Sequence, residues 1–236
     1  MKKLKLYYME MFMENRQQDK KDNNRFERKY ILDKNCSWKF KDFLIRKNFF
    51  KQFEKRKVNS IYFDTNNFSY LIDNLDGVSN RLKVRLRWYD QIGSTLNLEL
   101  KKKTGFVGWK EIYNFGKFIS VSEVFKLINS GKFINIVCNL ANKNLQPVLK
   151  TSYFREYFIN YSYKLRSTID TNLEFRSIKN YNLNICHNKE ILEFKYDRKY
   201  DDNYRNLISE RKFKFRLQKF SKYVIGMSIL KRNFLV

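Results

Sequence analysis

The chain has 236 residues, 43% of them hydrophobic and 17% aromatic, so it contains enough apolar material for a folded core. Its 49 lysines and arginines against 24 aspartates and glutamates give a formal net charge of +25, which predicts an anionic partner. The charge content is not that of a disordered chain, and no run approaches the ~18 apolar residues of a membrane span.

Cysteine and histidine are too sparse for several kinds of chemistry. The three cysteines are far apart and in no CxxC spacing, which predicts thiols in a reducing compartment and neither a disulfide frame nor a zinc site. His187 is the only histidine, which argues against a mechanism that needs several histidines. Glu10 and Glu14 interrupt the apolar start and no small-residue cleavage site follows, so a cytoplasmic location is expected.

Residues 1–24 end in a polar run and predict a poorly ordered tail. From 25 to 236 the chain has one proline and no linker or repeat, which predicts a single domain. Within it, alternation of charged and apolar residues predicts strands over 25–32, 58–65, 80–89, 94–103, 107–115, 148–161, 163–170, 190–196 and 211–216.

Fewer segments have helical signals. Trp38, Phe40 and Phe43 recur at helical spacing within 35–48, and a short helix is predicted over 67–76 with Gly77 as its C-cap. Ser120 and Glu123 form a capping box that opens a helix ending at Gly131. Residues 201–207 are interpreted as a polar helix or loop, and 220–230 as a short helix or strand.

The clearest strand pattern lies at residues 81–88. One face carries only cations and the other only apolar side chains; the cations are Arg81, Lys83, Arg85 and Arg87. Several strands with a charged row each predict an α+β, β-dominated fold, in which an antiparallel barrel with peripheral helices encloses a solvated, basic tunnel.

Three strands place a carboxylate and an ammonium group two residues apart: Glu27 and Lys29, Glu99 and Lys101, and Glu193 and Lys195. A single pair of this kind is usually an ion pair on an exposed strand. Three pairs beside a four-cation strand indicate a phosphate site, because carboxylates bind Mg²⁺ or Mn²⁺ while neighbouring cations bind phosphate oxygens.

Eight motifs in order carry a family resemblance. They are Arg25–Tyr30, Val58–Thr65, Lys83–Tyr89, Leu98–Lys101, Pro147–Leu149 with Tyr153 and Arg155, Arg166–Asp170, Leu192–Lys195, and Lys219–Tyr223 with Gly226. From Arg25 to about Met227 the chain resembles the polyphosphate polymerase domain of the vacuolar transporter chaperone (VTC) complex and its bacterial relatives. That domain is one of the triphosphate tunnel metalloenzymes, also called CYTH-like proteins.

The resemblance implies an eight-stranded antiparallel tunnel and assigns roles to individual residues. The catalytic cations would be Lys29, Arg85, Arg87 and Lys101. Other phosphate-binding cations would be Arg155, Arg166, Lys195 and Lys222, with Lys110 as an addition and Lys219 as another if its segment is helical. Glu193 would be the ligand of a Mn²⁺ or Mg²⁺ ion, with Glu27 and Glu99 as helpers.

The implied reaction transfers the γ-phosphate of a nucleoside triphosphate such as ATP to a growing polyphosphate chain, with protein groups that position and screen charge. The chain departs from the fuller Glu-x-Glu-x-Lys opening of the superfamily, because Arg25 stands where the first glutamate would be. One metal-binding carboxylate is therefore missing. This favours a cation-dominated polymerase or binding tunnel over a two-metal hydrolytic site.

Three alternatives stay open. The tunnel could bind polyphosphate or a nucleotide without turnover, as a sensor, or it could hydrolyse a triphosphate. Nucleic-acid binding is the interpretation from charge alone; against it, the cations alternate along strands, and the aromatic residues, Trp88 and Trp109 among them, are expected in the core. The sequence leaves the acceptor, the oligomeric state and a separate membrane partner open.

Overall fold

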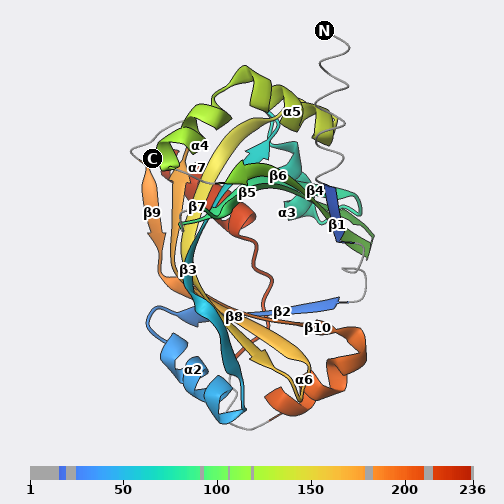
Figure 1. The fold of residues 1–236 in the computed structure, drawn as a ribbon, viewed down its shortest axis with the longest axis vertical. Coiled ribbons are helices and arrows are strands. Elements are labelled where there is room, and N and C mark those ends of the chain that lie inside the picture. Colours follow the sequence, from blue (N-terminus) through green and yellow to red (C-terminus); the bar gives the residue numbers. More distant parts are fainter. Residues whose placement is uncertain are drawn as a thin grey trace. The chain divides into compact units, whose positions relative to one another are not determined.

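The computed structural model describes residues 16–19, 25–90, 93–105, 107–117, 120–178, 183–209 and 215–234, with side chains between 25 and 231 (Figure 1). The chain forms two compact units. The first unit comprises Asn59–Lys150 and the N-terminal strand β1, and the second comprises Asn24–Val58 and Thr151–Val236. Residues 1–15 and 20–24 of the predicted tail lie outside the described residues.

Long antiparallel strands dominate both units. They are β2 (Arg25–Asp33), β3 (Phe50–Asp64), β4 (Arg81–Tyr89), β5 (Thr95–Thr104), β6 (Val107–Lys117), β7 (Gln146–Asn160), β8 (Leu165–Ser177) and β10 (Lys189–Asp197), with short β1 (Arg16–Asp19) and β9 (Asn184–His187). The strand order is β1-β6-β5-β4-β3 in the first unit and β3-β7-β8-β10-β2 in the second, where β9 pairs with β8; β3 and β7 contribute to both. The predicted β-dominated, antiparallel fold is confirmed.

Helices flank the strands. They are α2 (Ser37–Arg46), α3 (Ser69–Asp76), α4 (Val121–Ile128), α5 (Gly131–Ala141), α6 (Asp201–Ile208) and α7 (Lys222–Phe234), with a 3₁₀ turn, η2 (Arg198–Tyr200). The predicted helix start at Ser120 is confirmed, because the Ser120 hydroxyl accepts from the Glu123 N–H at 3.3 Å. Gly77 ends α3 in the left-handed conformation, with φ of 74°, as predicted.

Some predictions were incomplete or wrong. The helix predicted to end at Gly131 ends at Ile128, and Gly131 begins a second helix, α5. The Ser130 hydroxyl caps α5 by accepting from the Phe133 N–H. Trp38 was expected in the core, but it is 63% exposed. Strands β1 and β9 were not predicted, and β3 begins at Phe50, well before the predicted start. Most of the predicted strand 211–216 lies outside the described residues.

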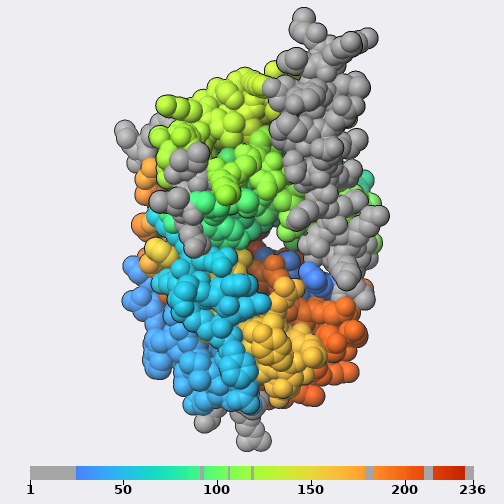
Figure 2. Space-filling view, in the orientation of Figure 1, coloured from blue at the N-terminus to red at the C-terminus, as the bar shows by residue number. Residues whose placement is uncertain are grey.

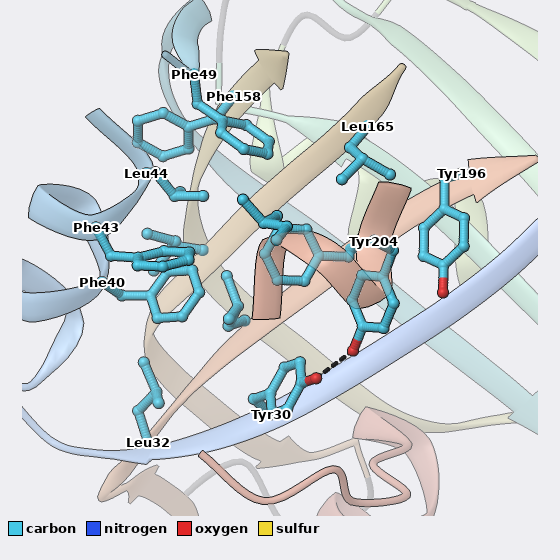
Figure 3. Packing of buried hydrophobic residues seen from close by; sticks show 14 residues of the cluster. Tyr30, Leu32, Phe40, Phe43, Leu44, Phe49, Phe158, Leu165, Tyr196 and Tyr204 are labelled. Atoms are coloured by element: carbon cyan, nitrogen blue, oxygen red, sulfur yellow. Dashed lines mark hydrogen bonds between the residues drawn. The ribbon is translucent and has the colours of Figure 1, made fainter. Parts of the chain in front are cut away.

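In the second unit an aromatic-rich core fills the space between the sheet and two helices. Figure 3 shows Phe40, Phe43 and Leu44 of α2 packed with side chains of the sheet and with Tyr204 of α6. The Tyr30 and Tyr204 hydroxyls are hydrogen-bonded to each other, and the Tyr204 ring stacks on Tyr196 with centroids 4.8 Å apart. These contacts fix which face of β2, β7, β8 and β10 is apolar, so the alternate residues form the other face.

The first unit has the same two-faced construction. Val84, Leu86 and Trp88 of β4 are fully buried, and the intervening cations point to the opposite face. Phe133 of α5 packs against Phe63 of β3 and Phe115 of β6, with centroid distances of 6.1 and 5.1 Å. Each unit therefore has one face buried under helices and one charged face.

The Asp64-Thr65 motif has a structural role in the first unit. Asp64 is fully buried, and its Oδ1 accepts from the N–H groups of Thr65 and Tyr70 at 2.7 and 2.9 Å. Its Oδ2 accepts from the Leu71 N–H at 3.0 Å. Because the first turn of a helix has unsatisfied N–H groups, Asp64 joins the end of β3 to the start of α3.

Candidate functional site

In the first unit, three lysines lie side by side across the sheet. Lys83 of β4 pairs in register with Lys101 of β5, and Lys101 pairs with Lys110 of β6. Side chains directly opposite each other on antiparallel strands share a face and have Cβ atoms about 5 Å apart. Like charges at such positions destabilise the sheet, so this arrangement favours an anion on that face.

Arg85 and Arg87 continue the same face and are organised by one carboxylate. Arg85 donates through Nε and Nη2 to Glu99 Oε2, at 2.8 and 2.5 Å, and Arg87 Nη1 lies 3.9 Å from Glu99 Oε1. Burial opposes ionisation of Glu99, but the charges of Arg85 and Arg87 outweigh it and hold its pKa far below the usual range. We call the set Lys83, Arg85, Arg87, Glu99, Lys101 and Lys110 the first charged face.

Two hydroxyl groups that accept hydrogen bonds also orient the arginines. The Arg85 Nη1 donates to the Tyr62 hydroxyl at 3.4 Å, and the Arg87 Nε donates to the Ser60 hydroxyl at 3.3 Å. Both partners come from β3, next to β4 in the sheet. The contacts of Arg85 and Arg87 with Glu99, Tyr62 and Ser60 all lie within the first unit.

In the second unit, Glu193 of β10 is surrounded by cations. It pairs in register with Lys29 of β2, and its Oε2 lies 3.9 Å from Lys29 Nζ. Its Oε1 lies 3.0 Å from Lys195 Nζ, which is also 3.3 Å from Glu27 Oε1. Arg166 of β8 pairs in register with Lys195. Burial raises the pKa of Glu193, but the nearby ammonium and guanidinium charges lower it by more, so this pKa lies far below the usual range.

Asp170 organises a second cluster on the same face. It is 1% exposed and accepts from Arg155 through Nε and Nη2, at 2.6 and 2.7 Å, and from Lys222 Nζ at 2.5 Å. Both cations also lie over the Tyr153 ring, with Lys222 Nζ 4.3 Å and Arg155 Cζ 5.2 Å from its centroid. We call Lys29, Glu27, Glu193, Lys195, Arg166, Arg155, Asp170 and Lys222 the second charged face.

The structure thus groups almost all sequence-predicted site residues on two faces, one in each unit. Lys219 stands apart, because α7 begins only at Lys222 and the helical turn assumed for Lys219 is absent; its side chain is exposed. Asp170 and Tyr153 belonged to quoted motifs, but their contacts with Arg155 and Lys222 were not predicted. No local signal shows that a residue of β8 meets the first residue of α7.

The carboxylates are engaged mainly by cations. Among the described residues, no group of three or more His, Cys, Asp or Glu side chains is arranged to hold a metal ion. His187 packs between Phe175 and Phe220, with centroid distances of 5.7 and 6.0 Å, and takes no part in either charged face.

Comparison with solved structures defines the class of fold. Two proposed adenylate cyclases are similar to this chain, each with a TM-score of 0.52 and 13% sequence identity. For the protein from Vibrio parahaemolyticus, the match covers 87% of this chain and 98% of that chain. For the protein from Bacillus halodurans, it covers 84% of this chain and 95% of that chain. At this identity the likeness shows the fold alone. The fold is that of CYTH-like triphosphate tunnel proteins.

The sequence profile of the VTC domain matches residues 24–231, and the chain belongs to the VTC domain family, as its motifs predicted. No curated protein sequence matches the chain. Within the described part of the chain, none of the helices has the length and apolar character needed to cross a membrane.

Proposed function

We propose that this protein is a phosphotransferase of the polyphosphate polymerase type, which transfers the γ-phosphate of a nucleoside triphosphate to a growing polyphosphate chain. The observation that carries the proposal is the lysine row of the first charged face. Lys83, Lys101 and Lys110 occupy directly opposed positions on three adjacent strands. Like charges at directly opposed positions repel each other, and a phosphate chain offers one negative charge after another at short intervals, which would match this row.

The arginines supply directional contacts for transferring phosphate. Glu99 fixes Arg85 through two N–H groups, and Arg87 is held by Ser60 and the charge of Glu99. A guanidinium group whose orientation is already fixed needs little reorganisation when charge develops on the phosphoryl oxygens. These contacts support a role for Arg85 and Arg87 in transition-state stabilisation, while the lysines bind the ground-state charge.

A divalent metal fits Glu193 better than Glu27 or Glu99. Glu193 is a buried, ionised carboxylate, whereas Glu99 Oε2 already accepts twice from Arg85 and the Glu27 carboxyl is partly exposed. Mg²⁺ and Mn²⁺ prefer hard oxygen ligands and often combine one or two carboxylates with phosphate oxygens and water. When bound, the metal would neutralise charge on the phosphoryl group. Lys29 and Lys195 would keep Glu193 ionised and oriented.

One assay tests the proposal against its alternatives. The purified protein is incubated with ATP and Mn²⁺, and long-chain polyphosphate, inorganic phosphate and bound polyphosphate are measured. We expect long-chain polymer. Inorganic phosphate without polymer would identify a triphosphate hydrolase, and tight polyphosphate binding without turnover would identify a sensor module. Tight binding to RNA with no response to polyphosphate would reject all three phosphate functions.

Glu193→Gln tests the metal ligand. We expect metal-dependent turnover to fall at least ~100-fold, in the range seen when a preorganised electrostatic group is removed. Polyphosphate binding without metal should be kept or strengthened, because Lys29 and Lys195 lose their counter-charge. The matched control is Glu156→Gln in the same unit, a carboxylate that pairs with Lys41 of α2 on the opposite face of the sheet. An unchanged rate in Glu193→Gln would remove Glu193 from the metal role.

A further inference from the structure

Lys195 of β10 contacts two carboxylates at once. Its Nζ lies 3.0 Å from Glu193 Oε1, on the same strand, and 3.3 Å from Glu27 Oε1, on β2. Lys195 and Glu27 are directly opposite each other in the strand register, and Glu193 is two residues from Lys195 on the same face. One ammonium group thus connects the predicted metal ligand, Glu193, with its predicted helper, Glu27.

Lys195 has more freedom to move than Glu193. The Lys195 side chain is 38% exposed and that of Glu27 is 31% exposed, whereas that of Glu193 is 7% exposed. Figure 2 shows the start of β2, in dark blue, at the surface beside orange atoms of the segment that includes the end of β10. Because its ammonium sits on a flexible four-carbon stem, Lys195 can turn away from the carboxylates while the sheet stays intact.

The oxygens that hold this ammonium are also suitable ligands for a divalent ion. Mg²⁺ and Mn²⁺ prefer hard oxygen ligands and often combine one or two carboxylates with phosphate oxygens and water. A single ammonium leaves one of the two negative charges uncompensated, and the Lys29 ammonium is farther away, 3.9 Å from Glu193 Oε2. A divalent ion would balance both carboxylates. The donor set therefore fits the metal that the tunnel fold implies, with the Lys195 ammonium in its place.

The ammonium and a divalent ion compete for these oxygens. Two cations that contact the same carboxylate oxygen repel each other strongly when that carboxylate is as buried as Glu193. The ion must therefore displace Lys195. Arg166 is opposite Lys195 on β8, so an ammonium released from the carboxylates stays beside another cation, an arrangement that favours a bound phosphate group.

We propose that Lys195 is an internal competitor of the divalent ion: its ammonium holds Glu27 and Glu193 when no metal is bound, and the ion binds by displacing it. The released ammonium then becomes a ligand for phosphate oxygens. The inference rests on the proposed function, because it assumes that a divalent ion binds at Glu193. It goes beyond that function by giving Lys195 a second role and by linking metal binding to phosphate binding.

The test measures the affinity of the protein alone for Mn²⁺, by isothermal titration calorimetry without phosphate. In Lys195→Met we expect this affinity to rise ~10-fold or more, because the variant removes a cation that competes with Mn²⁺ and repels it. Lys195→Gln, a second neutral variant, should show the same rise. Lys195→Arg keeps the positive charge and should give no rise.

Lys189→Met is the matched control. Lys189 lies on the same strand, and its Nζ is 2.5 Å from Oδ1 of Asp33, the residue opposite it on β2. The variant removes one positive charge from the same strand pair, away from Glu193, and should leave the Mn²⁺ affinity within about twofold of the wild-type value. An equal rise in Lys189→Met and Lys195→Met would reduce the effect to general electrostatics and overturn the inference.

Thermal unfolding gives a second readout and shows whether each variant is folded. At one Mn²⁺ concentration, the ion should raise the thermal midpoint more in Lys195→Met than in wild type, because a tighter ligand stabilises the folded state more. Folded neutral variants with wild-type or weaker Mn²⁺ affinity would overturn the competition and leave the metal role of Glu193 standing. If neither wild type nor the neutral variants bound Mn²⁺, the metal role in the proposed function would fail as well.

Discussion

Asp170 is the residue on which the second charged face depends most directly. It is buried and accepts from Arg155 on β7 and from Lys222 at the start of α7. Without its charge, two largely buried cations that both lie over the Tyr153 ring would be left without this shared carboxylate. Breaking a buried ion pair from one side is costly because the remaining charge is left uncompensated.

We therefore expect Asp170→Asn to lower the free energy of unfolding by about 3–5 kcal/mol, measured by urea denaturation. Adding polyphosphate should recover part of the loss, because the phosphates replace the missing negative charge. The control is Asp33→Asn, which removes a carboxylate that pairs with Lys189 at the surface and should change stability little. A loss in Asp170→Asn no larger than in the control would show that the cluster is not energetically coupled.

The same residue predicts a pH dependence. Burial opposes the charge of Asp170, but Arg155 and Lys222 outweigh it, so its pKa in the folded protein is lower than the ordinary 3.8. A carboxyl whose pKa is lowered by folding contributes stability above its unfolded pKa and loses it as the pH falls through the folded value. Wild-type stability should therefore fall below about pH 4, and Asp170→Asn should show a shallower fall between pH 4 and 2.

Some residues of the site could be predicted from the sequence and others could not. Alternation identified Arg85, Lys101 and Glu193, because a strand period of two shows which residues share a face. The start of β3 was missed because the residues from Phe50 to Phe53 do not alternate. The pairing of Asp170 with Lys222 joins residues 52 positions apart, and no local pattern encodes such a contact.

At the level of elements, periodicity and capping motifs predicted which strands and helices are present better than they predicted where these elements begin and end. Eight long strands and the cap of α4 follow from alternation and from Ser120 with Glu123. The boundary between α4 and α5 was lost because a glycine after a helix usually marks its end, while here Ser130 caps a new helix immediately. Strand β9 has only four residues and is a strand because it pairs with β8. The sequence alone does not show this pairing.

The register of β4, β5 and β6 predicts that Lys101 lowers the stability of the fold while it contributes to phosphate binding. Replacing Lys101 by Met keeps side-chain length and removes the charge opposite both Lys83 and Lys110. We expect the free energy of unfolding to rise by about 1 kcal/mol, from the relief of two like-charge pairs, while phosphate affinity falls. Urea denaturation and calorimetric titration with tripolyphosphate measure the two effects.

Lys102→Met is the control, because Lys102 lies next to Lys101 on the opposite face and its Nζ is 2.9 Å from Glu111 Oε1. It should lower stability and leave phosphate affinity nearly unchanged. A Lys101→Met protein that is less stable than the wild type would mean that the lysine row is compensated within the protein, and the main support for the phosphate function would be lost.

For the whole molecule, the placement of charge is more informative than its amount. The formal net charge of +25 is compatible with nucleic acid, a membrane surface or a phosphorylated ligand. Within each unit, cations gather on one sheet face while helices cover the other, and carboxylates such as Glu99 and Asp170 hold individual cations in place. That arrangement favours a flexible polyanion that binds along the charged sheet face. A ligand that binds to cations clustered on a helix fits it less well.

The same charge predicts how salt and ligand act on stability. Between 0.1 and 1 M NaCl the Debye length falls from about 10 to about 3 Å, so self-repulsion is screened and the thermal midpoint without ligand should rise. Polyphosphate at 100 times its dissociation constant should add about 2.7 kcal/mol at low salt, and because salt weakens the binding, the same ligand concentration should add much less at 1 M. Differential scanning fluorimetry with and without ligand measures both trends. A midpoint that falls with NaCl in the absence of ligand would show that the cations are already balanced within the folded protein.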